Sequence, residues 1–358
     1  MIGNKMMINL YEMTLDELTA QIVAWGEKPF RATQIWQWMY DQRVADFNAM
    51  TNLPASLRQR LTGTATLGNL QIVVEQSSAD GTRKRLYRLP DGQTIESVLM
   101  PYDDDRRTAC ISTQAGCAMG CVFCATGQMG FVRHLSAAEI FEQAVRFAVE
   151  LEAAGERLSN VVLMGMGEPF HNYDESLKAI RRLMSDLGIG ARHITVSTVG
   201  IVPRIYQFAD EGLQVRLAIS LHAAEDEGRG ALLPVNKRWN LDALLEACHY
   251  YVQKTGRRVT FEWALIDGET DTESDAHALG KLLRGLSCHV NAIPLNPTAG
   301  YGGQPSDPQV VARFIEILAG YGVPMTVRVR RGIDIAAGCG QLQSDVIRLA
   351  DIPQENPR

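Results

Sequence analysis

Residues 160–221 read NVVLMGMGEPFHNYDESLKAIRRLMSDLGIGARHITVSTVGIVPRIYQFADEGLQVRLAISL. Three apolar runs in this stretch are strand-like, and the two segments between them carry apolar residues at the three- and four-residue spacing of a helix. The same alternation begins near residue 105 and continues to PMTVRVR at residues 324–330. It predicts a parallel sheet whose strands are joined by right-handed crossovers. Roughly six or seven such units favour a barrel or partial barrel over a doubly wound sheet.

The chain before this alternating region divides into helical and strand-like segments. Residues 8–62 read as short helices, the first opened by a capping box of Thr14 and Glu17. Residues 70–100 read as three strands joined by tight Asp-Gly turns. We therefore expect four parts: a helical accessory domain over 1–68, a β-strand linker over 69–100, an α/β core over 101–342 and a tail over 343–358.

The middle strand of residues 70–100 holds the densest run of basic side chains in the chain. Arg83, Lys84, Arg85 and Arg88 lie within this one strand. Such charge is typical of an edge strand that is protected against aggregation. It equally suits a ribbon that contacts phosphates. The sequence leaves both interpretations open.

Composition and charge restrict the class of protein. Of 358 residues, 46% are hydrophobic and 21% are charged, which is typical of a globular chain and excludes wholesale disorder. No run of about eighteen apolar residues occurs, so no membrane span is expected. The first residues, MIGNKMMINLYEMTLDEL, lack the apolar centre of a secretory signal, so we expect a cytoplasmic protein. A net charge of −6 means that nucleic-acid binding would need a local basic patch.

Three of the seven cysteines are clustered. Cys117, Cys121 and Cys124 are spaced C-x3-C-x2-C in a glycine-flanked loop after the first strand of the alternating region. Three thiolates in one loop can hold three corners of a [4Fe–4S] cluster, whereas structural zinc normally takes four protein ligands. One iron would then stay open to a substrate or cofactor. The odd number of cysteines argues against a disulfide framework.

The cysteine motif, with Phe123 before its last cysteine, resembles the signature of radical S-adenosylmethionine (SAM) enzymes. The resemblance extends, in order and over almost the whole chain, to the RlmN/Cfr family of RNA adenine methyltransferases. The segments that carry it are GEKPFRATQIWQWMY, ACISTQAGCAMGCVFCATGQMGF, LMGMGEP, ITVSTVGIVP, LAISLHA, LLPVNKRWN, PLNP and RRGIDIAAGCGQL. One departure is Gly338, where the family usually has alanine; we expect it to loosen the loop without removing function.

This resemblance implies a fold, two cofactors and a reaction. The fold would be α/β, a partial (β/α)6 radical-SAM barrel with a small N-terminal helical domain that binds RNA and a connecting β-ribbon. The cofactors would be SAM and a [4Fe–4S] cluster on Cys117, Cys121 and Cys124. The reaction would be radical methylation of carbon 2 of adenosine in 23S rRNA and tRNA, with electrons from a flavodoxin-type protein.

Two further cysteines take part in the reaction that the resemblance implies. Cys339 would be methylated by a first SAM, lose a hydrogen atom to the radical from a second SAM and add to adenine as a methylene. Cys110 would then remove the carbon-bound proton, and a transient Cys110–Cys339 disulfide would form as the base leaves. Carbon 2 is electron-poor, so radical addition takes the place of simple displacement. From the residues alone, Cys110 equally suits a buried strand position and Cys339 an inert one.

The remaining predicted site residues mostly follow the strands of the barrel. By resemblance, Gly167 and Glu168 would bind the methionine part of SAM, and Glu96 would act as a general base. Further SAM contacts implied by the family are Ser197, Ser220, Leu221, His222 and Asn296. Several have ordinary structural alternatives, namely a turn glutamate, a barrel histidine, an Asn-Pro turn and a solvated glutamate on a strand.

Three other functions compete with this prediction. The nearest is Cfr-like methylation of carbon 8 of the same rRNA adenosine. A radical-SAM activase or mutase would leave RNA unmodified, and an iron–sulfur RNA-binding module would not cleave SAM. If RNA is the substrate, an unpaired or extruded adenosine must enter the barrel mouth. Its phosphates would then contact Arg83–Arg88, Arg106–Arg107 and Arg328–Arg331. Arg328 and Arg330 equally suit positions that face the barrel wall.

Overall fold

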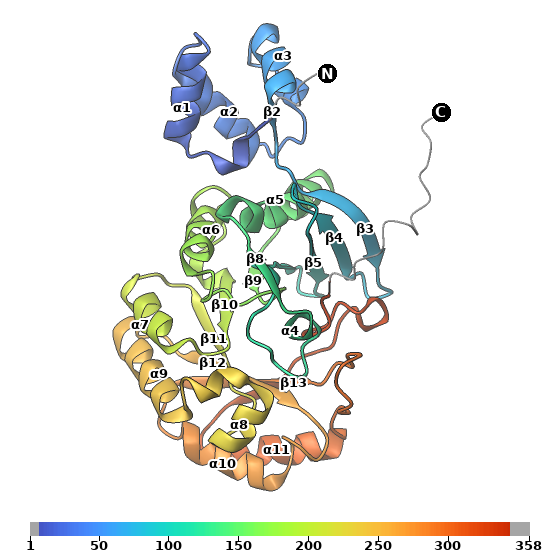
Figure 1. Ribbon diagram of the computed structural model, residues 1–358, viewed down its shortest axis with the longest axis vertical. Coiled ribbons are helices and arrows are strands. Elements are labelled where there is room, and N and C mark those ends of the chain that lie inside the picture. The colour runs from blue at the N-terminus through green and yellow to red at the C-terminus, as the bar shows by residue number, and fades with distance from the viewer. Residues whose placement is uncertain (1–6, 344–358) are drawn as a thin grey trace.

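The computed structural model describes residues 7–343, and helices at one end form a small region apart from a larger α/β body (Figure 1). These helices are α1 (Leu15–Ala24), α2 (Phe30–Tyr40) and α3 (Ala55–Thr64). The predicted capping box opens α1, because Thr14 Oγ1 accepts the amide of Glu17 and the Glu17 carboxylate accepts the amide of Thr14. A parallel pair of β1 (Ile8–Asn9) and β2 (Ala65–Thr66) joins the two ends of this region.

Within residues 7–343, one ten-stranded sheet forms the body of the protein. Its seven parallel strands follow one another in chain order: β6 (Arg107–Cys110), β9 (Asn160–Leu163), β10 (Ile194–Thr198), β11 (Arg216–Ser220), β12 (Val259–Leu265), β13 (Cys288–Pro294) and β14 (Met325–Val327). Antiparallel β5 (Thr94–Pro101), β4 (Arg83–Arg88) and β3 (Gln71–Ser77) extend it beyond β6. The barrel is partial because β14 and β3 end the sheet without pairing with each other. The fold predicted from the alternation is therefore confirmed.

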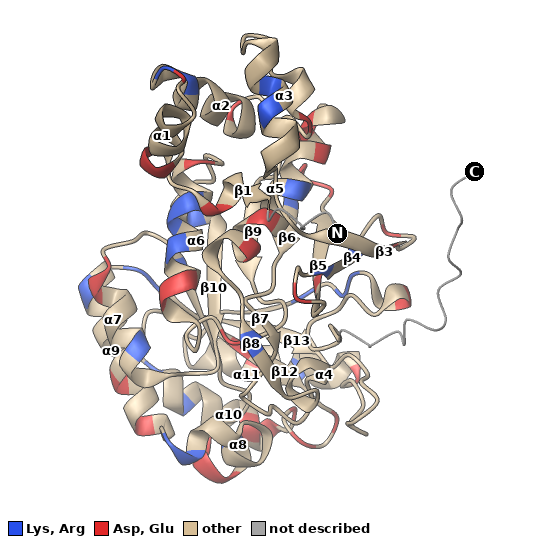
Figure 2. Cartoon of the chain, turned by 45° about the horizontal axis from the view of Figure 1, so that its top comes forward, with Lys and Arg blue, Asp and Glu red and all other residues tan. Residues whose placement is uncertain are grey.

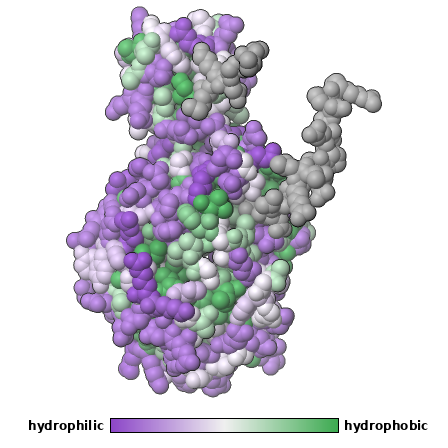
Figure 3. All heavy atoms as spheres, in the orientation of Figure 1, coloured by the Kyte–Doolittle hydropathy of each residue, from purple (hydrophilic) through white to green (hydrophobic). Residues whose placement is uncertain are grey.

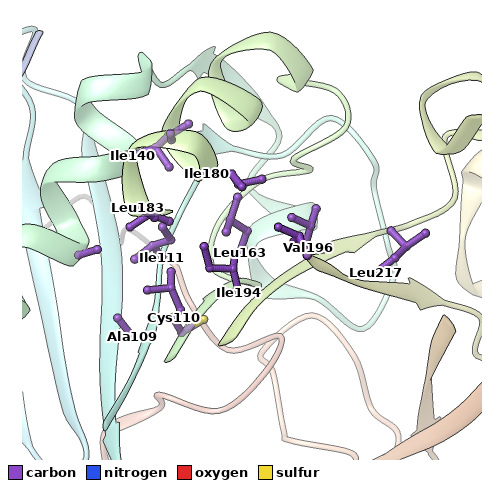
Figure 4. Close-up of a cluster of buried hydrophobic side chains, with 14 of the residues drawn as sticks. Ala109, Cys110, Ile111, Ile140, Leu163, Ile180, Leu183, Ile194, Val196 and Leu217 are labelled. Carbon is purple, nitrogen blue, oxygen red and sulfur yellow. The ribbon is translucent and has the colours of Figure 1, made fainter. Parts of the chain in front are cut away.

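Helices cover the outer face of the parallel strands (Figure 1). They are α5 (Ala137–Ala153), α6 (Tyr173–Ser185), α7 (Val202–Asp210), α9 (Leu241–Thr255), α10 (Glu273–Leu283) and α11 (Pro308–Gly320). The short helix α8 (Asp226–Leu232) lies instead at the carboxyl ends of the strands, where the Leu232 carbonyl accepts the amide of Val122 from the cysteine loop. Figure 4 shows part of the buried layer between them, where Leu163 of β9 and Ile194 of β10 lie near Ile140 of α5 and Leu183 of α6. Burial of such side chains, at roughly 25 cal/mol per Å², holds the helices on the sheet.

The helical region is anchored to helices α5 and α6 of the body. The Glu142 carboxylate of α5 accepts the amides of Asn69 at 2.8 Å and Leu70 at 3.0 Å. Arg182 of α6 donates to the Tyr40 hydroxyl of α2 at 2.6 Å. These contacts fix the chain where it passes from the helices to β3.

A hairpin lies outside the alternation that the sequence predicted. β7 (Gln114–Gly116) pairs antiparallel with β8 (Phe131–His134), and the loop between them contains α4 (Ala125–Gln128) and the three clustered cysteines. At Gly116 φ is +71°, and an added Cβ would lie 2.0 Å from the carbonyl oxygen of Gly130. Only glycine permits this close pairing, which closes the base of the cysteine loop.

The basic strand β4 is not an edge strand, which corrects one of the two interpretations of its charges. It lies between β3 and β5, and β3 forms the edge of the sheet. Arg85 is buried and paired with Glu75 and Glu150, while Lys84 Nζ lies 3.2 Å from Glu96 Oε1. Because carboxylates of neighbouring elements already hold Arg85 and Lys84, these two side chains do not form a ribbon open to phosphates.

Arg85→Ala is expected to destabilise the fold and to leave RNA affinity nearly unchanged. Loss of the guanidinium leaves Glu75 and Glu150 without their shared partner. Removing one member of a buried pair costs about 3–5 kcal/mol, and the partial exposure of both acids reduces this to about 2–4 kcal/mol. Chemical denaturation measures the loss. The control is Arg313→Ala, whose exposed pairs with Glu273 and Glu316 contribute little to stability. Weaker RNA binding by Arg85→Ala at unchanged stability would instead support the interpretation that Arg85 contacts phosphates.

Within residues 7–343, no helix is both long enough and apolar enough to cross a membrane. The predicted tail, 343–358, lies outside the described residues apart from its first position.

Candidate active site

Loops at the carboxyl ends of the parallel strands line a pocket of about 990 Å³, including its open mouth. A volume of this size accommodates a cofactor. Ten of the thirteen predicted site residues line it: Cys117, Cys121, Cys124, Gly167, Glu168, Ser197, Ser220, His222, Asn296 and Cys339. Of the other three, Leu221 is buried in the core, Cys110 lines an adjoining cavity and Glu96 lines neither.

Backbone hydrogen bonds hold the cysteine loop in place. The amide of Cys117 donates to the Gly130 carbonyl at 2.8 Å, and the amide of Ala125 donates to the Gly340 carbonyl at 2.8 Å. Burial raises the pKa of the Cys117 thiol to about 12 and raises the pKa of Cys121 well above its ordinary value. The free thiols are therefore protonated at neutral pH.

This set of thiols fits an iron–sulfur cluster. No three His, Cys, Asp or Glu side chains in the described part of the chain lie close enough together to share one metal ion. A cubane takes one thiolate at each corner, so its ligands stand farther apart than those of a single ion. Buried thiols of raised pKa ionise when a metal binds them. Cys117, Cys121 and Cys124 can thus hold three irons and leave a fourth open, all in one pocket.

Glu168 presents a buried carboxylate to the same pocket. Its Oε1 accepts the amide of Phe170 and its Oε2 accepts the amide of Val199, both at 2.8 Å. Burial outweighs these bonds and raises the pKa of Glu168 to about 7. The neighbouring Gly167 has φ +100°, and an added Cβ would lie 2.5 Å from Gln114 Cβ. The arrangement suits a ligand ammonium that comes close to the backbone.

Two predicted SAM contacts also have free capacity for hydrogen bonds. Asn296 Nδ2 donates to the Cys339 carbonyl at 3.0 Å, but its buried Oδ1 has no partner among the described residues. Because an unpaired buried acceptor costs free energy, Oδ1 is available to a ligand hydroxyl or amine. His222 Nδ1 accepts the amide of Ala264 at 2.9 Å, and burial lowers the pKa of His222 to about 3. The ring is therefore neutral and has an Nε2 hydrogen to donate.

Cys110 and Cys339 line one small cavity beside the main pocket. Cys110 ends β6 (Figure 4), and Cys339 lines both spaces. Both are free thiols, and burial followed by the proximity of Cys339 raises the pKa of Cys110 to about 12. Next to Cys339, a Cβ on Gly338 would lie 2.6 Å from Asn296 Nδ2. The alanine usual in the family would therefore require Asn296 to shift.

Two charged residues of the pocket were not predicted in this role. Arg328, for which the sequence left a phosphate contact and a position on the barrel wall open, lines both the pocket and the small cavity, and Glu262 lines the pocket. Asn291 Nδ2 donates to Glu262 Oε2 at 2.7 Å, and burial raises the pKa of Glu262. The sequence did contain a signal for Glu262, because this carboxylate stands inside the apolar strand run FEWAL. A carboxylate in such a run is buried, and a buried carboxylate costs free energy unless it has a partner or a ligand.

Glu96 is buried on β5 and does not lie on a solvated strand face. In addition to its pair with Lys84, its Oε2 accepts the amide of Gln343 at 3.1 Å. Its role as a general base stays a prediction.

The fold and the pocket define a radical SAM enzyme. The family model of the radical SAM superfamily matches residues 111–279. Among solved structures, a radical SAM methyltransferase from Sphaerobacter thermophilus superposes with a TM-score of 0.91. It is 48% identical, and the match covers 94% of this chain and 100% of that one.

Within this class, the chain belongs to the RlmN family of RNA methyltransferases. The model of the ribosomal RNA large subunit methyltransferase N-terminal domain matches residues 8–67. The chain is 52% identical to the dual-specificity RNA methyltransferase RlmN 1 of Myxococcus xanthus, with 95% of each chain covered. It is 49% identical to the probable dual-specificity RNA methyltransferase RlmN of Geobacillus thermodenitrificans, over 94% of this chain and 93% of the relative.

Proposed function

We propose that this protein methylates carbon 2 of adenosine in 23S rRNA and tRNA, using SAM and a [4Fe–4S] cluster. The observation that carries the proposal is the pairing of Cys110 with Cys339 in a cavity beside the pocket of the three clustered cysteines. An activase or mutase has no need of that pair. The dual-specificity names of the relatives support carbon 2 and do not favour the carbon-8 alternative.

In the proposed reaction the two cysteines act in order. When bound, the cluster and SAM supply a methyl group and a radical that abstracts hydrogen. The sulfur of Cys339 accepts the methyl group, and after loss of one hydrogen atom its methylene carbon bonds to carbon 2 of adenine. Cys110, as the thiolate, takes the proton from carbon 2, the bond between the Cys339 sulfur and the methylene carbon breaks, and that carbon takes the proton to become the methyl group. A Cys110–Cys339 disulfide forms, and the one electron left over from the radical addition would return to the cluster. The bond from Asn296 to the Cys339 carbonyl would hold that cysteine in position.

We assign RNA binding to the helical region and to arginines near the small cavity. Residues 1–68 would form the accessory domain, 69–100 the linker and 101–342 the core, in line with the family match at 8–67. Lys and Arg are interspersed with Asp and Glu along much of the chain (Figure 2), so RNA binding depends on local groups. Arg330 and Arg331 line the cavity of Cys339 and suit the phosphates of an extruded adenosine in cytoplasmic RNA.

Mass-spectrometric mapping of RNA tests the proposed function. The reconstituted, reduced protein is incubated with SAM and with 23S rRNA or tRNA, and modified nucleosides are identified. We expect 2-methyladenosine in both RNAs. 8-Methyladenosine would instead support the Cfr-like reaction. SAM cleavage without RNA modification would favour an activase or mutase, and no SAM cleavage would favour an RNA-binding module.

SAM binding is expected to release a proton. Since the pKa of Glu168 is raised to about 7 by burial, its carboxyl is mostly protonated in the free protein at pH of about 6. The ammonium of SAM favours the ionised form, so binding expels the proton and SAM affinity rises between pH of about 6 and 8. In the protein without SAM, the free energy of unfolding changes in the opposite direction. It falls as pH rises through about 7, because ionising the Glu168 carboxyl costs more in the folded protein than in the unfolded chain.

Calorimetry of the reconstituted protein in buffers of different ionisation enthalpy measures this proton release. Glu168→Gln is the control, because it keeps the shape and cannot ionise. It should bind SAM about tenfold or more weakly, as expected for the loss of a hydrogen bond to a charged group, and should release fewer protons than the wild type. An equal proton release by the variant would exclude Glu168 as its source.

A further inference from the structure

A second hollow lies against the cysteine loop and shares Met119 with the SAM pocket. It measures about 1080 Å³ with its open mouth. Ala118 and Met119, which line it, stand between Cys117 and Cys121 in the chain. A molecule seated in this hollow would therefore touch the cysteine loop without entering the SAM pocket.

An apolar patch continues the hollow onto the β7–β8 hairpin. The ring of Phe131 on β8 lies 5.4 Å from that of His171, which lines the hollow. Met129, Phe131 and Val132 are 40%, 41% and 53% exposed. Figure 3 shows hydrophobic side chains gathered on the face where β8 and α4 lie. Contiguous exposed apolar side chains mark interaction surfaces, and we call the hollow and this patch together the loop-side surface.

The strongly charged side chains that line the hollow are basic. They are Arg204 and Arg238, and no Asp or Glu of the described chain lines it. The Arg238 guanidinium carbon lies 4.6 Å from the ring centroid of Trp239, and that of Arg204 lies 4.8 Å from the ring centroid of Tyr173. Stacking on these rings fixes the position of both guanidiniums, and their positive charge stays available to a binding partner. Positive charge beside apolar surface is complementary to an acidic protein with an apolar contact area.

A buried glutamine makes this surface rigid. Gln114 Oε1 accepts the amide of Glu168 at 2.8 Å, and its Nε2 lies 3.0 Å from Nδ1 of both His134 and His171. Because the Nε2 group carries two hydrogens, it can donate to both rings. The loop-side surface is thus tied to the backbone of the SAM pocket and is already formed before a partner arrives.

We propose that the loop-side surface is the docking site of an acidic protein that donates single electrons to the cluster. This inference rests on the proposed function, because a cluster must be bound for reduction to occur. The step balances: the reduced flavin of the donor loses one electron, the cluster gains it, and no bond forms or breaks. Docking there would leave little more than Ala118 and Met119 between donor and cluster.

RNA suits this surface less well than a protein does. Met129 and Val132 are aliphatic, so Phe131 is the one exposed ring of the patch, and the ring of Trp239 in the hollow is already stacked by Arg238. The adenosine must also reach Cys339, which lines the main pocket and the small cavity but not this hollow.

The test compares a protein donor with a chemical reductant. Arg238→Glu reverses an exposed charge of the hollow, and Val132→Glu places a carboxylate in the apolar patch. In the reconstituted protein, each should weaken binding of reduced flavodoxin by about tenfold or more, measured by interferometry, and should slow flavodoxin-driven SAM cleavage. Cleavage driven by dithionite, which needs no docking site, should be unchanged.

Two matched variants serve as controls. Arg284→Glu reverses an exposed charge before β13, at the amino ends of the barrel strands, and Ile72→Glu adds a carboxylate at a position of β3 that is 49% exposed. Both should bind flavodoxin as the wild type does. Normal flavodoxin binding by Arg238→Glu and Val132→Glu would overturn the proposal. It would also be overturned if these variants lost affinity for RNA while their affinity for flavodoxin stayed normal. Absence of SAM cleavage with dithionite in the wild type would count against the proposed function alone.

Discussion

Replacing any one of Cys117, Cys121 or Cys124 by alanine is expected to remove both iron and activity. The wild-type protein, purified without oxygen, should be brown and hold about four irons per chain. Each variant retains only two of the three thiols that line the pocket, too few to hold the cluster against loss. Iron and sulfide assays, the visible absorption spectrum and the yield of 5′-deoxyadenosine measure the effect, and SAM cleavage should fall below detection.

Cys248→Ala is the matched control for these variants. Cys248 is fully buried in α9 and lines neither the pocket nor the small cavity. Its loss should lower stability modestly and leave colour and SAM cleavage intact. Stoichiometric zinc without iron in the wild-type protein would refute the assignment of the cluster.

The barrel and the position of the site were predictable because both follow from local sequence periods. Strands and helices from residue 105 onward each have their own apolar spacing, and parallel strands joined by crossovers bring their carboxyl ends together. Glu168, Ser197, Ser220 and Asn296 all follow or end a strand, so one rule placed them in a single pocket. The roles of these residues came from the family resemblance, because the spacing of apolar residues carries no information about chemistry.

Features that depend on distant contacts could not be predicted. The charges of β4 looked exposed because Glu150, which pairs with Arg85, lies 65 residues away on α5. Glu96 looked solvated because its partner Lys84 comes from the neighbouring strand. The β7–β8 hairpin was missed because strands of three or four residues carry too few positions for a period. The contact of Arg85 joins parts of the chain that no local window includes, whereas that of Glu96 depends on which residues of two adjacent strands stand opposite each other.

Cys110→Ala is expected to leave the protein covalently joined to RNA. Cys339 still forms its methylene bond to adenine in this variant, but the residue that takes the proton from carbon 2 is missing. Cys110 is placed for that step because it lines the cavity of Cys339. Burial raises the pKa of its thiol to about 12, so the thiol must first lose its own proton, and the thiolate is then a strong base. The adduct should survive denaturation and appear as a shifted, nuclease-sensitive band on a denaturing gel, with methylated RNA reduced below detection.

Cys339→Ala and the double variant establish the order of the two steps. Cys339→Ala should give neither methylated RNA nor adduct, although the clustered cysteines and the iron content remain. The double variant should show no shifted band, because the bond to adenine starts from Cys339. Cys288→Ala, at a buried strand cysteine away from both cavities, should methylate RNA as the wild type does. Normal turnover by Cys110→Ala, or an adduct formed without Cys339, would show that the two cysteines do not act in sequence on one bond.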